Sequence, residues 1–399
     1  MPTREAASSF SSAVAEYQPR KNRMRSTDAF SNYTERLRKF IARHSSPTDG
    51  ASSDSDFNEL ALELFARQLE NVPPFRELCR AKNISQVTHW KQIPAVPTTA
   101  FKEYEMTSLA SEERSAVFHS SGTTEQRPSR HFHSADSLAI YEASLLPWFQ
   151  KNFLGDHEDL LENETVNATE KFGFIILTPP PTLAPNSSLV HMFETVRREL
   201  GSRDSFFGGQ LDNNGAWTLD IEQVLFGIRK SMCANRPIAI VGTAFSFVHL
   251  LDHFEAKNMR YRLAEGSRVL ETGGYKGRSR VLPKPELHAL ITKHLGISTS
   301  HIFCEYGMSE LSSQAYDAPL AHSRSFKFPA WARVQIISPE TGLEVGEGET
   351  GLIRIYDLAN VRSVMAIQTE DLGIRRGDAL ELIGRSAVVE PRGCSLMST

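Results

Sequence analysis

Apolar residues recur at helical spacing in the first quarter of the chain. A helix is predicted over 28–44, capped by Ser26 or Thr27, with its apolar face made by Phe30, Leu37, Phe40 and Ile41. After a Ser/Asp-rich break at 47–56, a second amphipathic helix covers 57–69, and a short one runs from Pro73 to about Lys82. These segments predict a helical layer over 28–115 that forms the N-terminal part of a larger body and is not a separate unit.

From about Val117 the pattern changes to strands, glycine-rich turns and helices in alternation. A helix capped by Ser187 or Ser188 follows the rigid loop TPPPTLAPNSS, and another helix covers 247–254. The predicted strands cover 172–177, 237–245, 269–270, 301–304, 332–337, 351–356 and 379–383. This order predicts an α/β body over 116–385, with ligands bound at the strand ends.

Composition excludes several classes of protein. The 399 residues are 40% hydrophobic and 23% charged, as in an ordinary globular protein. The formal net charge of −4 gives no overall electrostatic attraction to nucleic acid or to an anionic membrane. The longest apolar stretch, 238–251, is too short and too polar to span a bilayer. The cysteines (Cys79, Cys233, Cys304 and Cys394) form no CxxC pair, which argues against a disulfide framework or a zinc site and indicates a reducing, cytoplasmic compartment.

The first 27 residues are rich in Ser, Ala and Arg and lack apolar periodicity. We expect a disordered leader there; a transit peptide is the alternative.

The run SSGTTEQRPSR at 120–130 is the first candidate for chemistry. Its small hydroxyl residues surround Gly122, with Arg127 and Arg130 close by. Such a loop points N–H, hydroxyl and guanidinium groups at phosphates, although it is not a Walker loop. A flexible Ser/Thr turn explains the same residues. His131 and His133 follow as an HxH pair; without a third ligand, one face of a strand is the better interpretation.

Two further runs follow predicted strands. ETGGYKGR at 271–278 has paired glycines that let a flat ring lie against the backbone, or that form a plain hairpin turn. EYGMSE at 305–310 combines an aromatic ring, a hydroxyl and a carboxylate: Tyr306 to stack on a base, Ser309 for a phosphate and Glu310 for Mg²⁺. An N-capping serine at a strand end is the alternative for the second run.

The last run is TEDLGIRRGDALELIGR at 369–385, in which Asp371 is suited to the two ribose hydroxyls and Arg385 to a phosphate or ribose. A surface hairpin turning at Gly377 and Asp378 is the alternative. Beyond it, Cys394 lies in the terminal run RGCSL, where Arg392 favours the thiolate.

The order of these runs resembles the adenylate-forming superfamily of acyl-CoA synthetases and luciferase-like enzymes over most of 115–390. The resemblance is greatest to the acyl-protein synthetases of bacterial luminescence (LuxE type), relatives of phenylacetate–CoA ligases. It rests on IPAVPTTAFKEYEM, the Ser/Thr loop followed by SRH, SSLVHM, GGYKGRSR, EYGMSE and RGCSL.

The resemblance implies a role for each matched position. Gly273 and Gly274 match the turn under adenine, and Asp371 and Arg385 match the ribose-binding aspartate and the arginine before the usual hinge. Cys394 matches the cysteine that becomes acylated. The phosphate loop is matched by Ser120, Ser121, Gly122, Thr123, Thr124 and Arg130, and the adenine, α-phosphate and magnesium motif by Tyr306, Gly307, Ser309 and Glu310.

Three departures from the family pattern stand out. Glu125, Gln126 and Arg127 interrupt the phosphate loop, which ends in Arg130 instead of lysine, and Val388 replaces the usual hinge residue. The small C-terminal domain with its catalytic lysine is missing, which favours the acyl-protein synthetases over CoA ligases. The positive charge of that lysine would then come from Lys276, Arg278 or Arg280, and the sequence does not select among them.

The implied function is ATP- and Mg²⁺-dependent activation of a carboxylic, expectedly fatty, acid. The acyl group then passes from the adenylate to Cys394 in the tail at 386–399, expected to be mobile, and on to a partner such as an acyl reductase. One alternative is an acid–CoA or acid–carrier ligase, which would not need Cys394. The other is an inactive nucleotide-binding scaffold subunit.

Overall fold

The computed structural model describes residues 26–45, 54–120, 127–155, 172–274, 279–320 and 323–385. The predicted leader, apart from its last two residues, and the predicted tail therefore lie outside the described residues. The division into a helical part, an α/β body and a tail stays a prediction. None of the described helices combines the length and the apolar character needed to cross a membrane.

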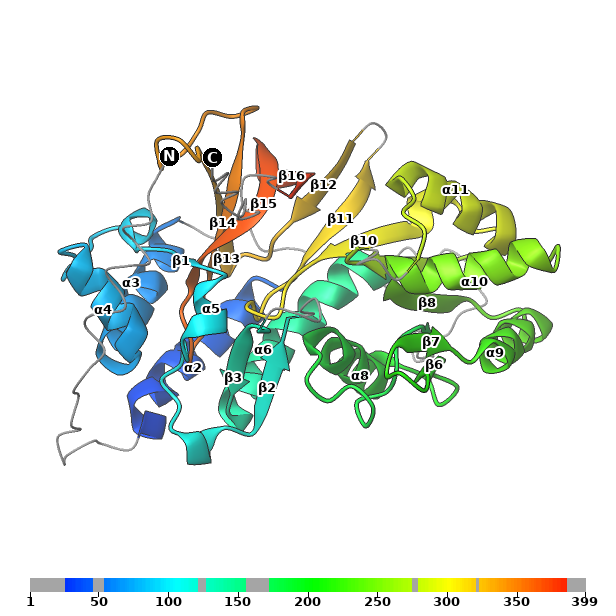
Figure 1. Cartoon of the computed structure of the whole chain (residues 1–399), viewed down its shortest axis with the longest axis horizontal. Helices are drawn as coiled ribbons and strands as arrows, with labels where there is room; N and C mark the ends of the chain where they lie inside the picture. Colours follow the sequence, from blue (N-terminus) through cyan, green and yellow to red (C-terminus); the bar gives the residue numbers. More distant parts are fainter. Residues whose placement is uncertain are drawn as a thin grey trace, which may run out of the picture.

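One large sheet organises the molecule, and its strand order is β13-β14-β15-β16-β12-β11-β10-β9-β8-β4-β5, with β1 paired to β15 (Figure 1). Strands β5, β4, β8, β9 and β10 are parallel, whereas β10 to β13 along this order are antiparallel. The strands of this sheet are β1 (Val96–Pro97), β4 (Gly173–Ile176), β5 (Phe206–Phe207), β8 (Ile238–Thr243), β9 (Arg268–Thr272), β10 (Ile302–Tyr306), β11 (Ala315–Leu320), β12 (Ser323–Lys327), β13 (Ala332–Ile337), β14 (Thr350–Asp357), β15 (Ala366–Arg376) and β16 (Ala379–Arg385).

Helices cover both faces of the parallel half, and the sequence of its strands explains why. Side chains alternate between the faces of a strand, so a parallel strand between two helical layers is apolar throughout. In β8, Ile238 and Ile240 pack into the cluster with α9, α10 and α11, whereas Ala239 and Val241 pack into the cluster with α6 and α8. The helices are α6 (Ala135–Phe149), continued by η3 (Gln150–Leu154), α8 (Ser188–Leu200), α9 (Ile221–Ala234), α10 (Ala244–Ala256) and α11 (Lys284–Leu295).

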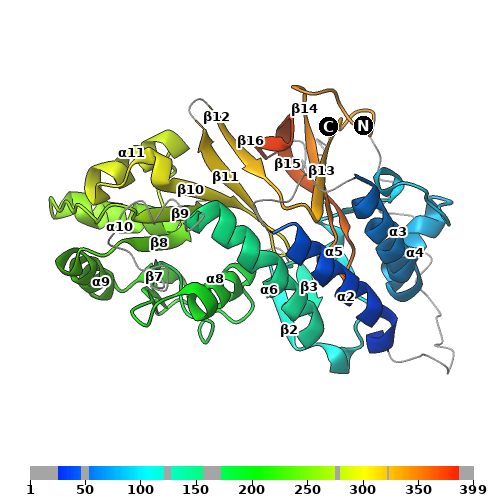
Figure 2. The ribbon, with the colours of Figure 1, turned by 180° about the vertical axis from the view of Figure 1, so that it is seen from behind.

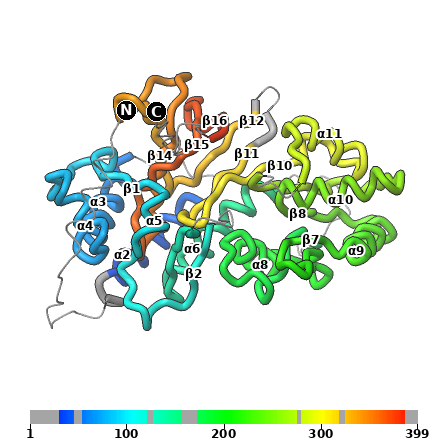
Figure 3. Tube along the Cα trace, viewed as in Figure 1, coloured from blue at the N-terminus to red at the C-terminus, as the bar shows by residue number. Residues whose placement is uncertain are grey.

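The N-terminal helices share one core with the antiparallel half of the sheet. Phe57, Phe65 and Phe75 are buried in the same cluster as Ile353 and Ile367, so segments from the two ends of the described chain fold together. Figure 2 shows α2 alongside α6 on the back of the molecule, and Figure 3 traces the chain from this end to the helices α9–α11 at the other. The elements here are α2 (Ser26–Arg43), α3 (Asp54–Asn71), α4 (Pro73–Ala81), η1 (Trp90–Gln92), α5 (Ala100–Glu103) and η2 (Ser111–Glu113).

Two small hairpins and a short connector complete the described elements. Hairpin β2 (Ala116–His119)–β3 (Arg130–His133) carries the predicted phosphate loop, and β6 (Gly209–Leu211) pairs with β7 (Trp217–Leu219). The connector η4 (Thr299–His301) precedes β10.

Several local expectations are confirmed or corrected. Ser187 caps α8 by accepting a hydrogen bond from the Val190 N–H at 3.3 Å, as one of the two predicted caps. The strand expected over 237–245 ends at Thr243, because Thr243 caps α10 through the Ser246 N–H. Helix α2 covers Ser26–Arg43 among the described residues, so the two predicted caps, Ser26 and Thr27, lie within it.

Candidate active site

The glycine turn and the EYGMSE loop lie side by side because β9 and β10 are parallel neighbours. Thr272 at the end of β9 is the register partner of Glu305, and its hydroxyl also donates a hydrogen bond to the Glu305 carboxylate. Since β9 connects through α11 to a parallel strand, the hairpin interpretation of ETGGYKGR is wrong. Two predicted ligand-binding segments thus meet at one edge of the sheet, as carboxyl ends of parallel strands do.

Gly273 and Gly274 leave open space at this edge. Gly273 has a φ of +68°, a left-handed conformation that disfavours side chains. A Cβ added at either glycine would meet no heavy atom of the described residues within 4 Å. This bare backbone is suited to the close approach of a flat ring. Lys276 and Arg278, two candidates for the missing positive charge, lie outside the described residues.

Gly307, which follows β10, is packed differently. A Cβ there would strike the Glu305 carboxylate, so glycine lets that side chain fold back beneath the loop. Burial raises the pKa of Glu305 to about 7, although the Thr272 hydroxyl acts in the opposite direction. The loop after β10 therefore packs against the Glu305 carboxyl group, which ionises less readily than an exposed glutamate.

Asp371 joins the TED segment to the EYGMSE loop. The Tyr306 hydroxyl donates to its Oδ2 at 2.9 Å, and the Arg385 Nε lies 3.4 Å from its Oδ1. Asp371 and Arg385 are register partners in the hairpin of β15 and β16, which turns at Gly377 as the alternative interpretation expects. The hairpin and the predicted site coincide, so the two interpretations of this run do not exclude each other.

Ser309 and Glu310 lie together under the β2–β3 hairpin. Ser309 Oγ donates to Glu310 Oε2 at 2.9 Å, and the two residues are 7% and 5% exposed. The His131 Nδ1 of β3 lies 2.9 Å from the Ser309 carbonyl oxygen, and the Oγ of Ser129, which precedes β3, lies 3.4 Å from Ser309 Oγ. The hairpin that carries the predicted phosphate loop therefore contacts the predicted magnesium segment directly.

The loop itself is described only at its two ends. Ser120 Oγ accepts from the Ser129 N–H at 3.0 Å, which closes the base of the loop. Ser121, Gly122, Thr123 and Thr124 lie outside the described residues. Arg130 Nη1 lies 3.3 Å from Glu105, so its guanidinium has an acidic partner.

The HxH pair lies on one face of β3, as expected. The imidazole rings of His131 and His133 are 4.2 Å apart and both side chains are buried. Burial lowers the pKa of His131 to about 4 and that of His133 well below the usual value, so both rings are neutral at pH 7. Among the described residues they join no third metal-ligating side chain.

The buried carboxylate of Asp357, which sequence reasoning missed, holds the loop that follows Glu310. It accepts hydrogen bonds from the Ser312 N–H at 2.9 Å, the Ser313 N–H at 2.8 Å, the Ser313 hydroxyl at 2.7 Å and the Ala359 N–H at 2.9 Å. Burial raises the pKa of Asp357, and these donors counteract the rise. The sequence did offer one sign of this role, because Asp357 is the last residue of an apolar strand.

Asn360 was missed as well. Its Nδ2 donates to the Glu310 carbonyl at 2.9 Å, and its own carbonyl accepts from Gln68 of α3 at 2.8 Å. The N-terminal helices are thereby linked to Glu310 through a single intervening residue. No spacing in the sequence connects Gln68 to Asn360, since 292 residues separate them.

Of the remaining candidates, Arg280 is engaged elsewhere and Cys394 lies outside the described residues. Arg280 Nη2 lies 2.7 Å from Asp252 and 3.3 Å from Glu255, on the outer side of α10. The described residues thus bring together, beside the ends of β9 and β10 and the hairpin of β15 and β16, the residues Gly273, Gly274, Tyr306, Gly307, Ser309, Glu310, Asp371 and Arg385.

The chain is similar to curated relatives and to solved structures. The long-chain-fatty-acid–luciferin-component ligase of Aliivibrio fischeri is 21% identical over 352 residues, covering 85% of this chain and 86% of the relative. The protein of the same description from Vibrio harveyi is 23% identical over 337 residues, covering 82% of each chain.

The fold matches that of a 2-hydroxyisobutyryl-CoA ligase in two states. The open conformation with 2-HIB-AMP and CoA gives a TM-score of 0.59 at 12% identity, over 85% of this chain and 79% of that one. The postadenylation state with R3-HIB-AMP gives 0.60 at 10% identity, over 85% and 72%. At such identities the likeness shows the fold, which is that of an adenylate-forming enzyme.

The family model described as acyl-protein synthetase, LuxE, matches residues 187–399, more than half of the chain. The match spans the glycine turn, EYGMSE, Asp371 and the terminal RGCSL. The family resemblance of the sequence is thereby confirmed, and the chain belongs to the LuxE family of acyl-protein synthetases.

Proposed function

We propose that this chain activates a long-chain fatty acid with ATP and transfers the acyl group to its own Cys394. The observation that carries the proposal is the meeting of four separate sequence runs beside the ends of β9 and β10. Thr272 is bonded to Glu305, Ser129 lies 3.4 Å from Ser309, and Tyr306 is bonded to Asp371. The names of the two bacterial relatives support a long-chain fatty acid as the substrate.

In the first step a carboxylate oxygen attacks the α-phosphorus of ATP. A bond from that oxygen to phosphorus forms, the bond to the bridging oxygen breaks, and pyrophosphate leaves. The open backbone of Gly273 and Gly274 receives the adenine, and Asp371 accepts hydrogen bonds from the ribose hydroxyls. Tyr306 holds the Asp371 carboxylate in place for this purpose.

Glu310 provides a carboxylate for Mg²⁺, which usually binds through one or two protein carboxylates together with phosphate oxygens and water. A single buried carboxylate beside a serine hydroxyl fits that requirement. When bound, the ion neutralises negative charge on the phosphates. Ser309 donates its hydroxyl proton to Glu310 in the free protein, and it would turn this proton to the α-phosphate once Mg²⁺ occupies the Glu310 carboxylate.

In the second step the Cys394 thiol loses its proton to solvent and the sulfur attacks the acyl carbon. The carbon–sulfur bond forms, the bond from that carbon to the AMP oxygen breaks, and AMP leaves. AMP is a far better leaving group than the oxide of a free carboxylate, which is why activation precedes transfer. A partner such as an acyl reductase then accepts the acyl group.

Intact-protein mass spectrometry tests both steps. Wild type and a Cys394→Ser variant are incubated with Mg-ATP and fatty acids of graded length. The exposed Cys233 provides a matched control as Cys233→Ser. We expect a hydroxylamine-labile acyl adduct on wild type and on Cys233→Ser, and none on Cys394→Ser.

Pyrophosphate exchange on the same proteins separates the alternatives. Cys394→Ser retains exchange if the cysteine acts only as acceptor. Exchange without any adduct, together with formation of acyl-CoA when CoA is added, would favour a CoA ligase. Nucleotide binding without exchange on wild type would favour an inactive scaffold subunit.

A further inference from the structure

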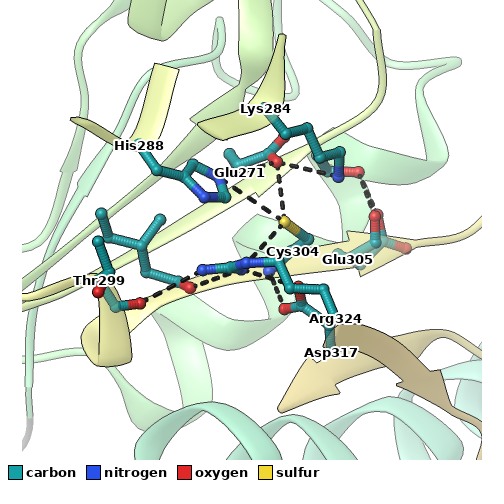
Figure 4. A network of polar contacts seen from close by, with 10 residues as sticks. Glu271, Lys284, His288, Thr299, Cys304, Glu305, Asp317 and Arg324 are labelled. Atoms are coloured by element: carbon teal, nitrogen blue, oxygen red, sulfur yellow. Dashed lines mark hydrogen bonds and ion pairs between the residues drawn. The ribbon is translucent and has the colours of Figure 1, made fainter. Parts of the chain in front are cut away.

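Three metal-ligating side chains meet beneath the glycine turn and have no part in the function proposed above. Glu271 comes from β9, His288 from α11 and Cys304 from β10 (Figure 4). All are buried, with exposed fractions of 0%, 4% and 0%. The Cys304 Sγ lies 2.8 Å from Glu271 Oε1 and 3.9 Å from His288 Nε2, and the latter two atoms are 3.4 Å apart.

These separations are close to those of a tetrahedral metal centre, and one of the three already agrees. Zinc with bonds of ~2.3 Å to sulfur and ~2.0–2.2 Å to nitrogen and oxygen holds its ligand atoms roughly 3.3–3.6 Å apart. The nitrogen–oxygen distance already agrees, and the sulfur–nitrogen distance is a few tenths of an ångström longer. The sulfur and Oε1 have to separate by about 0.7 Å, which rotation of two side-chain torsions provides.

Glu271 also carries a buried oxygen that the described residues leave without a hydrogen-bond partner. That atom is Oε2, whereas Oε1 accepts from Cys304 and lies 3.0 Å from the Lys284 ammonium. A carboxylate oxygen left without a partner in a protein interior is destabilising. Its neighbours therefore do not satisfy this carboxylate completely, and a cation bound to Oε1 would place further positive charge beside it.

We propose that Glu271, His288 and Cys304 bind Zn²⁺ or a similar divalent transition metal, with water in the fourth position. One thiolate, one imidazole and one carboxylate form a donor set that such metals prefer and that Mg²⁺ and Ca²⁺ do not. The site is therefore separate from the magnesium predicted at Glu310. Binding releases the Cys304 thiol proton to solvent.

Two cationic side chains border the site, and they behave differently. Lys284 is 43% exposed, so its ammonium withdraws to solvent when a metal takes over Glu271. Arg324 is fixed by a 2.8 Å contact with Asp317, and its Nη1 lies 3.5 Å from the Cys304 sulfur. An N–H group directed at a metal-bound thiolate is the kind of outer contact that tunes such ligands.

The metal would fasten three elements that frame the predicted adenine turn. Glu271 precedes Thr272 and the glycine pair, and Cys304 precedes Glu305, to which Thr272 is bonded. The sequence has no CxxC pair and therefore gave no sign of a zinc site. The three proposed ligands lie on different elements, and only the fold brings them together.

Metal content of the full-length protein tests the proposal. Wild type is stripped with a chelator, reloaded with zinc and assayed by plasma mass spectrometry and by competition with a chromophoric chelator. Cys304→Ser and His288→Asn are the test variants, and Cys79→Ser removes a different buried thiol as the control. We expect one zinc per chain in wild type and Cys79→Ser, and at least a tenfold weaker affinity in both test variants.

Lys284→Met gives a second readout that does not require disturbing the core. Loss of the competing ammonium is expected to strengthen zinc binding and to increase the rise in melting temperature that zinc produces. Cobalt loading provides a spectroscopic signature, because a thiolate-to-cobalt absorption band appears in wild type and not in Cys304→Ser. If wild type binds no more zinc than Cys304→Ser, or if Lys284→Met does not strengthen binding, the proposal is wrong and Lys284 is the sole counter-charge of Glu271.

Discussion

The Tyr306 hydroxyl donates a 2.9 Å hydrogen bond to Oδ2 of Asp371, although 65 residues separate them. Tyr306 ends β10 in the parallel half of the sheet, and Asp371 lies within β15 in the antiparallel half. The contact therefore joins the two halves at the position where the nucleotide is proposed to bind. Burial and the nearby carboxylate raise the pKa of Tyr306, so the hydroxyl stays a donor at any physiological pH.

Asp371→Asn is expected to weaken ATP binding far more than Tyr306→Phe. A hydrogen bond to a charged group contributes about 1.5–3 kcal/mol, so loss of the carboxylate raises the KM for ATP by about 10- to 150-fold. Tyr306→Phe keeps the ring and removes one positioning hydrogen bond, which we expect to cost several-fold. ATP-dependent pyrophosphate exchange measures both, and equal KM values for wild type and Asp371→Asn would contradict the ribose assignment.

Asp357→Asn is expected to destabilise the protein and to reduce the rate of adenylation. The amide group supplies one acceptor oxygen where the carboxylate supplies two, so at least one pair of buried donors faces an N–H₂ group. Each buried group left unsatisfied costs about 1–3 kcal/mol. Urea denaturation measures the loss, with Asp378→Asn as control because its side chain is 80% exposed. An unchanged midpoint for Asp357→Asn would show that the loop does not depend on this carboxylate.

Gln68→Ala tests whether the N-terminal helices support Glu310. Gln68 Nε2 donates to the Asn360 carbonyl at 2.8 Å and its Oε1 accepts from the Met365 N–H at 3.1 Å, while Asn360 donates to the Glu310 carbonyl. We expect a loss of about 3 kcal/mol in unfolding free energy and a lower kcat for pyrophosphate exchange. A double-mutant cycle with Asn360→Ala measures the coupling, and strictly additive effects would mean that the two residues act independently.

His131 makes stability depend on pH. Burial holds its pKa at about 4 in the folded protein, against about 6.5 in an unfolded chain, so the unfolded state binds more protons between these values. Its contribution is therefore complete above pH 6.5 and is lost as the pH falls toward 4, by on the order of 3 kcal/mol. Adjacent His133 has a lowered pKa as well and adds to the same trend.

His131→Asn isolates this contribution. Because a carbonyl oxygen only accepts, the His131 Nδ1 carries the proton in its contact with Ser309, and the asparagine amide offers a donor in its place. Unfolding free energies measured at pH 7.5 and 5 are expected to differ less in the variant than in wild type. The same pH dependence in both proteins would assign the effect to other groups.

Sequence reasoning reached the strands and the chemistry that follows them, but not the contacts that hold the site together. The glycine turn and EYGMSE were found because each places unusual residues directly after an apolar strand. Their adjacency follows from the parallel pairing of β9 with β10, which no local pattern specifies. Asp357, Asn360 and the Glu271–His288–Cys304 cluster were missed because their partners are distant in sequence and their own surroundings look like ordinary strand and helix.

Gly274→Ala separates binding from folding at the proposed adenine turn. A Cβ at this position meets no heavy atom of the described part of the chain within 4 Å, so we expect the unfolding free energy to stay within about 0.5 kcal/mol of wild type. If adenine lies against the Gly274 backbone, the added methyl group occupies its place and the KM for ATP rises at least tenfold. Gly342→Ala is not an adequate control because Gly342 has a φ of +72°, which strains any side chain. The informative comparison is therefore between the melting temperature and the ATP affinity of the same variant. A stable Gly274→Ala protein with wild-type affinity for ATP would show that adenine does not bind at this turn.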